Sequence, residues 1–221
     1  MSSVQAKTAA KTPRVPRGPN AERRATTRAK IMSATVKCLA EFGYAATSTP
    51  LVAKLAKVSR GSLLHQFPTK IDLMLAVAKH ASDVRGSTVR RFLADYPAQP
   101  ARFLAGVDAV WASLQTQEAI ALMEVTIAAR SDPELAARYP EFAGDLDATL
   151  HRARERMAET LGAPQRMPEI ETIAHLTRAA IEGLAMGSVF IGRPTDDALR
   201  VLALLKTLRQ DLVDELQKPA S

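Results

Sequence analysis

Apolar residues recur every three or four positions along most of the chain, which is the spacing of amphipathic helices. No stretch has the alternating pattern of a strand, and Gly and Pro mark breaks between the helical stretches. The pattern predicts an all-α protein of about nine helices. The expected helices cover about residues 20–42, two short helices between 48 and 67, then 70–94, 101–117, 118–130, 140–161, 169–191 and 196–217.

Two short helices separated by a tight break are predicted within residues 47–70. Ser48 can cap the first, because its hydroxyl can accept a hydrogen bond from a free backbone N–H, and Pro50 suits the first turn, where its missing N–H costs little. Ser59 can cap the second helix after the break at 57–59. A short helix with a polar leading end fits the major groove of DNA. On this pattern alone, the pair is either a helix-turn-helix or a plain antiparallel helix pair in a bundle.

The residues around this pair resemble the N-terminal domain of the TetR family of transcriptional regulators, which favours the helix-turn-helix. The resemblance extends without a gap over about residues 27–75. Two positions depart from the family pattern: Lys57 stands in place of the usual turn glycine, and Leu64 in place of a tyrosine that contacts a phosphate. A lysine at positive φ would be strained. The resemblance is carried by Ile31 to Phe42, Gly43-Tyr44, Ala46-Thr47-Ser48, Val52-Ala53, Val58 to Leu63, His65 and Phe67 to Lys70.

Charge supports a nucleic-acid-binding face in the same part of the chain. Residues 1–70 hold 13 Lys or Arg and two Glu, whereas residues 71–221 hold 17 Lys or Arg and 21 Asp or Glu. Residues 1–22 are expected to form a disordered basic arm, since they contain three prolines and few large apolar side chains. Residues 23–70 then form the helix-turn-helix DNA-binding domain. For residues 71–221 the resemblance implies a helical domain for ligand binding and dimerisation.

Double-stranded DNA is therefore the expected partner. Arginines can bind phosphates, enter a minor groove or form paired hydrogen bonds with guanine, and hydroxyl groups can hold phosphates. Leu64 is expected either to touch a thymine methyl group or only to pack. The expected DNA contacts are Arg14, Arg17, Arg23, Arg24, Arg28, Thr47, Ser48, Arg60, Ser62, Leu64, His65 and Lys70.

The resemblance also implies a small-molecule pocket among the central helices, whose ligand shifts the spacing of the two DNA-reading units of a dimer. Large, adaptable side chains such as Trp111 and Met123 suit the wall of an apolar pocket. Glu124, the one acid in an apolar run, could orient a polar group of the ligand or face solvent. Ordinary core packing is the alternative for every member of the set. The expected pocket residues are Phe92, Phe103, Val107, Trp111, Leu114, Met123, Glu124 and Ile127.

The last two helices are predicted to pair with those of a second copy in a homodimer. The final helix is apolar nearly all round at residues 199–205, and such a helix needs partners on more than one side. The preceding helix carries Gly183 and Gly187, which permit close approach. The resemblance implies a four-helix interface, and closure of the monomer core is the alternative. The expected interface residues are Ile173, Thr177, Ile181, Leu184, Leu202 and Leu205.

Several functional classes find no support in the sequence. The one cysteine, Cys38, cannot form a disulfide within the chain and indicates a reducing, cytoplasmic location. No apolar run approaches the roughly 18 residues that span a membrane. The four histidines lie far apart, so no metal site is expected. Without a phosphate-binding loop or a catalytic triad, we predict neither a cofactor nor an enzymatic activity.

Together these features predict a TetR-like DNA-binding regulator. We expect a homodimeric repressor that a small, mostly apolar ligand releases from a palindromic operator. The alternative is a helical DNA-binding protein that acts as an architectural or partner-dependent factor without a ligand. Release of specific DNA by a small molecule separates the two.

Overall fold

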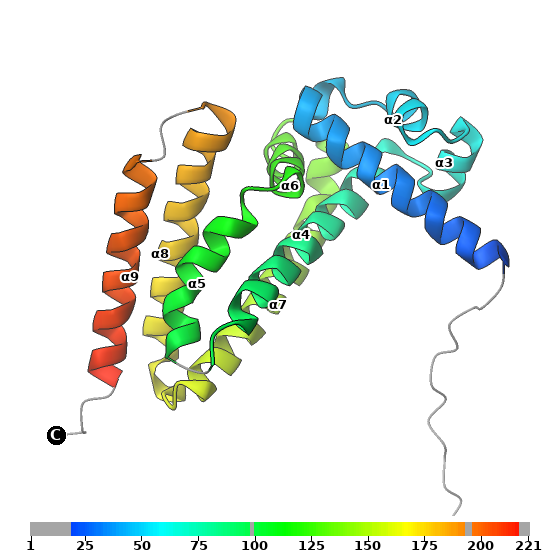
Figure 1. Ribbon diagram of the computed structural model, residues 1–221. Helices are drawn as coiled ribbons and strands as arrows, with labels where there is room; N and C mark the ends of the chain where they lie inside the picture. Colours follow the sequence, from blue (N-terminus) through cyan, green and yellow to red (C-terminus); the bar gives the residue numbers. More distant parts are fainter. Residues whose placement is uncertain (1–18, 98–99, 193–195, 217–221) are drawn as a thin grey trace, which may run out of the picture.

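The computed structural model describes residues 19–97, 100–192 and 196–216, and all regular structure within these ranges is helical (Figure 1). The predicted all-α class is thereby confirmed. A 3-10 turn at Pro164–Arg166 and a π turn at Met186–Phe190 accompany the α-helices. The α-helices are α1 (Pro19–Ala46), α2 (Thr49–Ala56), α3 (Arg60–Gln66), α4 (Lys70–Ala94), α5 (Ala101–Ser113), α6 (Gln117–Ala128), α7 (Pro133–Thr160), α8 (Met167–Ala185) and α9 (Asp196–Leu216).

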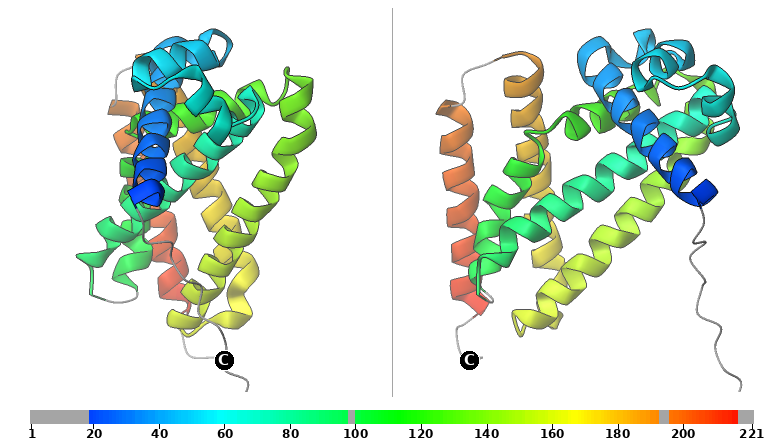
Figure 2. Two further views of the ribbon diagram at one scale, coloured as in Figure 1. Left: turned by 90° about the vertical axis from the view of Figure 1, so that its right-hand side faces the viewer. Right: turned by 45° about the vertical axis from the view of Figure 1, so that its right-hand side comes forward.

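The helices form groups that follow one another from one end of the molecule to the other (Figure 1 and Figure 2). Helices α1, α2 and α3, which we call the N-terminal helices, form one end. Helices α8 and α9 lie side by side at the other end, and α4 and α7 run between the two ends. We call α4 to α9 the C-terminal helices.

Most helices begin at a side chain that caps them. A cap accepts hydrogen bonds from backbone N–H groups that helix geometry leaves free. The caps that the sequence predicts at Ser48 and Ser59 are confirmed. The first turns of α2, α3, α4, α6 and α7 donate to the side chains of Ser48, Ser59, Thr69, Thr116 and Asp132.

Some helix boundaries differ from the sequence expectation. Helix α1 begins at Pro19, so residues 19–22, expected in the arm, are helical, and residues 1–18 lie outside the described part. Helix α7 begins at Pro133 rather than near Pro140, because Asp132 caps the earlier start. Pro140 then lies inside α7, where it removes one hydrogen bond without ending the helix.

One hydrophobic core joins the N-terminal helices to α4 and α6. It includes Leu39 of α1, Leu63 of α3, Met74 of α4 and Val125 of α6, all at most 1% exposed. Burial of each such side chain contributes about 1.5–3 kcal/mol. The packing therefore continues past residue 70, and α6 belongs to the same packed unit as the N-terminal helices.

A second, smaller core holds α5, α8 and α9 together. Its buried residues include Val107 and Leu114 from α5 and its end, Ile181 from α8, and Leu202 and Leu205 from α9. Helix α6 contributes Ala119 to the second core and Val125 to the first, so the start of α6 connects the two cores.

Arg209 of α9 brings a charge into the packing between α9 and α5. The residue is 6% exposed, and its Nη1 donates a hydrogen bond to the backbone oxygen of Phe103 at 2.5 Å. Its guanidinium lies 4.7 Å from the centre of the Phe103 ring. Burial lowers the pKa of Arg209 to about 10, so the side chain remains charged at neutral pH. Gly106 makes room for it, since a Cβ atom there would lie 2.6 Å from Nη1.

Lys57, which follows α2, has a left-handed backbone, with φ 54° and ψ 45°. Among the described residues it is the one non-glycine residue with positive φ. The left-handed conformation lets its N–H donate to the carbonyl oxygen of Lys54 at 3.2 Å and turns the chain toward α3. The lysine in place of the usual glycine therefore has the strained geometry that the sequence predicts.

We expect Lys57→Gly to raise the free energy of unfolding by about 1 kcal/mol, because glycine removes the side-chain clash of the left-handed conformation. Urea denaturation followed by circular dichroism measures the change. Lys54→Gly, at an exposed position inside α2, is the matched control and should lose about 1 kcal/mol. Equal effects of the two substitutions would contradict the strain.

We expect Gly106→Ala to destabilise the protein by about 1–3 kcal/mol, because the new methyl group would collide with the held guanidinium of Arg209. Gly144→Ala is the control, since nothing lies within 4 Å of a Cβ atom at that exposed helix position, and it should stabilise slightly. Adding Arg209→Met to Gly106→Ala should restore most of the stability that Gly106→Ala removes. Thermal melts of the four proteins decide between these outcomes.

Candidate nucleic-acid interface

Helices α2 and α3 form the two-helix unit that the sequence predicts. Val52, Ala53 and Ala56 of α2 and Leu63 of α3 are buried against α1 and α4 in the first core. The inward faces of both helices are therefore occupied. The residues of α3 that remain outside the core are available for contact with a partner.

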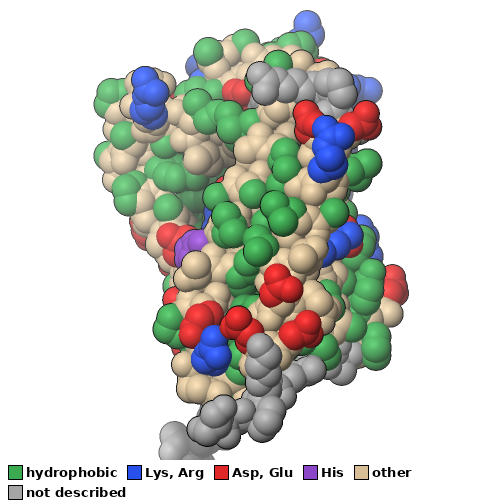
Figure 3. All heavy atoms as spheres, turned by 90° about the vertical axis from the view of Figure 1, so that its left-hand side faces the viewer, with side chains coloured by type: hydrophobic (Ala, Val, Ile, Leu, Met, Phe, Trp, Pro, Cys, Tyr) green, Lys and Arg blue, Asp and Glu red, His purple; other side chains and the backbone are tan. Residues whose placement is uncertain are grey.

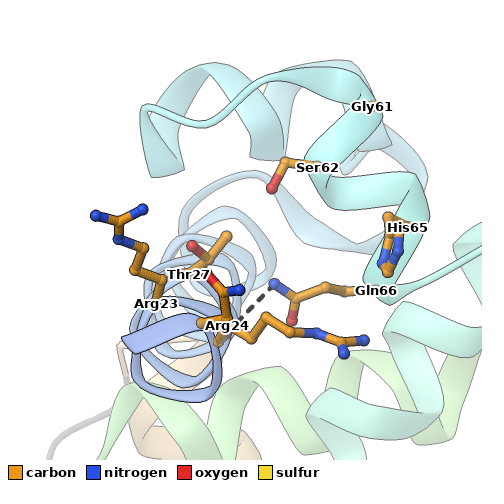
Figure 4. A pocket seen from close by; sticks show the side chains of 8 residues that line it. Arg23, Arg24, Thr27, Gly61, Ser62, His65 and Gln66 are labelled. Carbon is orange, nitrogen blue, oxygen red and sulfur yellow. Dashed lines mark hydrogen bonds between the residues drawn. The ribbon is translucent and has the colours of Figure 1, made fainter. Parts of the chain in front are cut away.

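The exposed side of α3 and the start of α1 enclose an open pocket of about 600 Å³. Arg23, Arg24 and Thr27 of α1 face Ser62, His65 and Gln66 of α3 across it (Figure 4). Gln66 Nε2 donates to the backbone oxygen of Arg24 at 3.4 Å, which ties the two walls together. The full lining is Asn20, Arg23, Arg24, Thr27, Gly61, Ser62, His65 and Gln66.

This face of the molecule is strongly basic. Between residues 19 and 70, nine Lys or Arg stand against two Glu. Arg23, Arg24, Arg60 and His65 are exposed. Such a concentration of cations and donors on one face attracts a polyanion and suits the phosphates and base edges of a duplex.

Arg28 of α1 contacts the end of α3 beside the basic pocket. Its guanidinium lies 4.5 Å from the centre of the Phe67 ring, just beyond the end of α3. It also lines a smaller hollow with Arg24, His65 and Gln66. A guanidinium stacked on an aromatic ring is attracted by the negative face of the ring. Arg28 therefore fixes α1 to α3 while its charge adds to the basic face.

The structure places two expected DNA contacts elsewhere. Thr47 is buried, and its hydroxyl donates to the backbone oxygen of Gly43 at 2.7 Å. Lys70 Nζ donates to the backbone oxygen of Tyr44 at 3.1 Å and lies 4.2 Å from the centre of that ring. Burial lowers the pKa of Lys70. In this structure both polar groups are used to join α1 to α2 and α4.

Among the other expected contacts, Ser48 is exposed at the start of α2, where its hydroxyl caps the helix. Leu64 is partly buried and packs against the first core, in agreement with the packing alternative. Arg14 and Arg17 lie outside the described residues.

Tyr44 connects the N-terminal helices to three of the C-terminal elements. Its backbone N–H donates to Glu124 Oε2 of α6 at 2.8 Å, and its hydroxyl donates to Asp132 Oδ2, before α7, at 2.6 Å. Burial and the Asp132 bond raise the pKa of the Tyr44 hydroxyl, and the same bond lowers the pKa of Asp132. Gly43, at φ 75°, brings the chain so close that a Cβ atom would lie 3.2 Å from Glu124 Oε2.

Two of the eight expected pocket residues have surroundings other than the wall of an apolar pocket. Glu124 accepts the Tyr44 N–H at the junction with α1, and Ile127 is 52% exposed on α6. Phe103, Val107 and Leu114 are buried. Phe92, Trp111 and Met123 are partly buried, and Phe92 stacks on Tyr96 with ring centres 6.0 Å apart. Helical spacing predicted the apolar face but not which neighbour covers each side chain.

Four of the six residues expected at the subunit interface are buried within this single chain. Thr177, Ile181, Leu202 and Leu205 are at most 3% exposed, so a second copy could not reach them. They close the packing of α8 against α9 and α5, as the core alternative for these helices predicts. Ile173 and Leu184 are partly buried.

Four lining residues of the basic pocket were not among the expected DNA contacts: Asn20, Thr27, Gly61 and Gln66. Thr27 lies four residues after Arg23 on α1, and Gln66 lies four residues after Ser62 on α3. Residues four apart on a helix share a face, so this spacing is the signal that could have found them. The exposed Leu176 of α8 was also missed, whereas the exposed Leu199 and Leu204 of α9 belong to the apolar block 199–205 that the sequence analysis assigned to pairing.

The described residues contain neither a metal-binding cluster nor a membrane-spanning helix. No group of three or more His, Cys, Asp or Glu side chains in this part of the chain could hold a metal ion. None of the helices resolved here combines the length and the apolar character that a membrane crossing requires.

Comparison with known proteins agrees with this geometry. The model of the family described as bacterial regulatory proteins, tetR family, matches residues 31–77. An HTH-type transcriptional regulator of Mycobacterium tuberculosis, strain H37Rv, is 28% identical over 197 residues, covering 86% of this chain and 97% of the relative. The regulator BetI of Burkholderia mallei, strain NCTC 10229, is 28% identical over 203 residues, covering 87% of this chain and 94% of the relative.

Solved structures share the fold. A transcriptional regulator from Rhodococcus sp. RHA1 superposes with a TM-score of 0.60 at 22% identity, covering 85% of this chain and 94% of the other. Salmonella enterica GusR also gives a TM-score of 0.60 at 22% identity, with 85% and 95% covered. The match over the helix-turn-helix and the shared fold lead to one conclusion: residues 31–77 match the family of bacterial regulatory proteins called tetR, and the chain is similar over most of its length to HTH-type transcriptional regulators.

Proposed function

We propose that two copies of this chain form a repressor that binds a palindromic DNA operator and leaves it when a small molecule binds the C-terminal helices. The observation that carries the DNA-binding part is the basic pocket between α1 and α3. A helix-turn-helix without such a face would be ordinary bundle packing. Here Arg23 and Arg24 of α1 line the same open pocket as Ser62, His65 and Gln66 of α3 (Figure 4).

In this proposal α3 enters the major groove and α1 lies along the backbone. Arg60, at the start of α3, and His65 are exposed and can reach base edges, where arginine pairs with guanine O6 and N7. Arg23 and Arg24 on the opposite wall can bind phosphates, which position the protein on the duplex. Ser62, on the same pocket wall as His65, can contact either a base edge or a phosphate.

The second copy is proposed to pack on the outer face of α8 and α9. Leu176 is 47% exposed on α8, and Leu199 and Leu204 are 60% and 58% exposed on α9. An adjoining groove of about 330 Å³ is lined mainly by apolar side chains of the two helices. Apolar side chains gather over this end of the molecule, with acidic and basic groups among and around them (Figure 3). Contiguous exposed apolar surface marks an interaction site.

Dimerisation and DNA binding support each other in this arrangement. A dimer with two-fold symmetry presents two copies of α3, so its operator should be a palindrome with half-sites about one helical turn, or a multiple, apart. Helices α8 and α9, which line the groove, lie at the opposite end of the molecule from α3 (Figure 1). Movement of one C-terminal half relative to the other therefore changes the spacing of the reading helices, which is how a ligand could release DNA.

We expect Arg60→Ala to cost on the order of 1–3 kcal/mol in operator binding and to relax the base preference. Arg24→Ala should weaken all sequences similarly and reduce the salt dependence by about one unit of slope. The operator is first selected from random duplex DNA, and affinities for operator and random DNA are then compared. Arg156→Ala, at an exposed position of α7, is the control and should change neither. Equal losses on both DNAs for Arg60→Ala would make Arg60 a phosphate contact.

We expect Leu204→Glu to weaken the dimer by at least about tenfold without unfolding the chain, because the carboxylate would be buried unpaired against the second copy. Operator affinity should fall in parallel. Ile127→Glu, at a similarly exposed position of α6, is the matched control and should leave the dimer intact. Sedimentation velocity gives the oligomeric state, and circular dichroism verifies folding. A Leu204→Glu protein that remains a full dimer would place the interface on another face.

A further inference from the structure

Two buried side-chain atoms stand out because they lack a hydrogen-bond partner. Within the described part of the chain, Nε of Arg85 and Nε of Arg209 are the buried side-chain nitrogen or oxygen atoms in this condition. Both atoms are donors, and both belong to cations of the C-terminal helices. Buried polar groups are normally paired, so each exception requires an explanation.

Arg209 has an explanation within the fold. Its Nη1 is held by the Phe103 carbonyl, and its guanidinium fills the space that Gly106 leaves. It is 6% exposed, and α5 covers it. A ligand would have to separate α5 from α9 to reach it, so Arg209 serves as a packing group.

Arg85 of α4 has different surroundings. Its side chain is 18% exposed, and its Nη2 lies 3.7 Å from Glu182 Oε1 of α8. The same oxygen accepts a hydrogen bond from Arg178 Nε at 3.0 Å. Two guanidinium groups from two helices therefore share one carboxylate oxygen.

The positive charge at this place exceeds the nearby negative charge. Asp147 of α7 lies 4.0 Å from Arg178 Nη1 but is 77% exposed, so water screens it. Burial lowers the pKa of Arg85, and the positive charge of Arg178 lowers it further, against the opposite effect of Glu182. A desolvated guanidinium with an incomplete set of acceptors is stabilised by a further anionic oxygen.

The neighbouring side chains are suited to an apolar group. Phe92 lies seven residues after Arg85 on the same face of α4, about 10 Å along the helix. Tyr139 of α7 packs edge-to-face on Phe142 with ring centres 5.4 Å apart. Burial raises the pKa of the Tyr139 hydroxyl, and the charges of Arg178 and Glu182 also act on it.

We propose that the C-terminal helices bind a small monocarboxylate with an apolar body, whose carboxylate takes the place of Glu182 between Arg85 and Arg178. The side chain of Glu182 acts as an internal stand-in for the ligand, which shows that a carboxylate fits between the two guanidinium groups. This inference names the ligand class for the proposed ligand-released repressor and rests on that proposal. It adds one negative charge to the mostly apolar molecule expected from the sequence.

The site is connected to the DNA-binding end through α4. Arg85 lies on the helix whose first residue, Lys70, binds Tyr44. A carboxylate that draws Arg85 and Arg178 together, and that frees Glu182, changes the contact between α4 and α8. The ligand thereby favours one position of α4 over another, which is the condition for an effect on DNA binding.

The test is titration calorimetry on the full chain without DNA. The probes are octanoate and 3-phenylpropionate, each paired with its neutral analogue, octan-1-ol and 3-phenylpropan-1-ol. We expect at least one acid to bind at least about tenfold more tightly than its alcohol, since a charged hydrogen bond contributes about 1.5–3 kcal/mol. Arg85→Gln should remove this preference, and Arg85→Lys should restore part of it.

Glu182→Gln distinguishes a ligand site from a merely structural ion pair. If Glu182 competes with the ligand, its replacement should tighten the binding of the acid, whereas a structural pair would show only a lower melting temperature. Arg156→Gln, which removes an exposed arginine of α7, is the matched control and should change nothing. Circular dichroism of every variant verifies that it is folded.

Three results would overturn the proposal. These are alcohols that bind as tightly as the acids, acid binding that Arg85→Gln leaves unchanged, and no heat from either acid with both the native protein and Glu182→Gln. Operator binding is measured separately on the same preparations. Loss of specific DNA binding would contradict the proposed function, whereas a failed titration with intact operator binding would contradict only this ligand class.

Discussion

Tyr44 is the residue through which the DNA-binding end is fixed to the rest of the molecule. Its backbone N–H, hydroxyl, carbonyl oxygen and ring contact Glu124, Asp132 and Lys70, on three separate elements. A partly buried polar cluster stabilises a structure only when its members are satisfied, and here each donor meets an acceptor. Gly43 makes the arrangement possible, because its positive φ kinks α1 near its end and its missing side chain leaves room for the Glu124 carboxylate. The angle at which α1 meets α6 follows from these contacts.

The shared core strengthens this constraint. Since α6 and the first half of α4 are packed with α1, α2 and α3, the DNA-reading helices cannot reorient alone. The first core meets the second at the start of α6, and motion between the two ends in the proposed mechanism is placed there and along the later part of α4. Arg85 lies on that part of α4, beside α8. A ligand there acts at the boundary between two packed units, where a small change in contact can alter their relative orientation.

The two ends of the molecule present opposite chemistry. The α1–α3 end exposes arginines around an open pocket, which suits a polyanion. The α8–α9 end exposes leucines around an apolar groove, which suits a second protein surface. Charged groups inside the C-terminal helices, Arg85, Arg178 and Arg209, belong to neither surface. The burial of Arg85 and Arg209 costs free energy, and a role in packing or in ligand binding accounts for their presence.

The sequence by itself determined the features that depend on neighbours along the chain: the helical class, the caps at Ser48 and Ser59, and the break between α2 and α3. Serine caps are local, so residue type and spacing predict them, whereas the lysine at position 57 argued against the left-handed conformation that the structure has there. Only the tertiary structure decided that Lys70 and Glu124 both meet Tyr44, and that Leu202 and Leu205 face the inside of their own chain. Periodicity shows which face of a helix is apolar, but the neighbour that covers the face comes from distant segments. A polar side chain then binds whichever donor or acceptor that packing brings within reach.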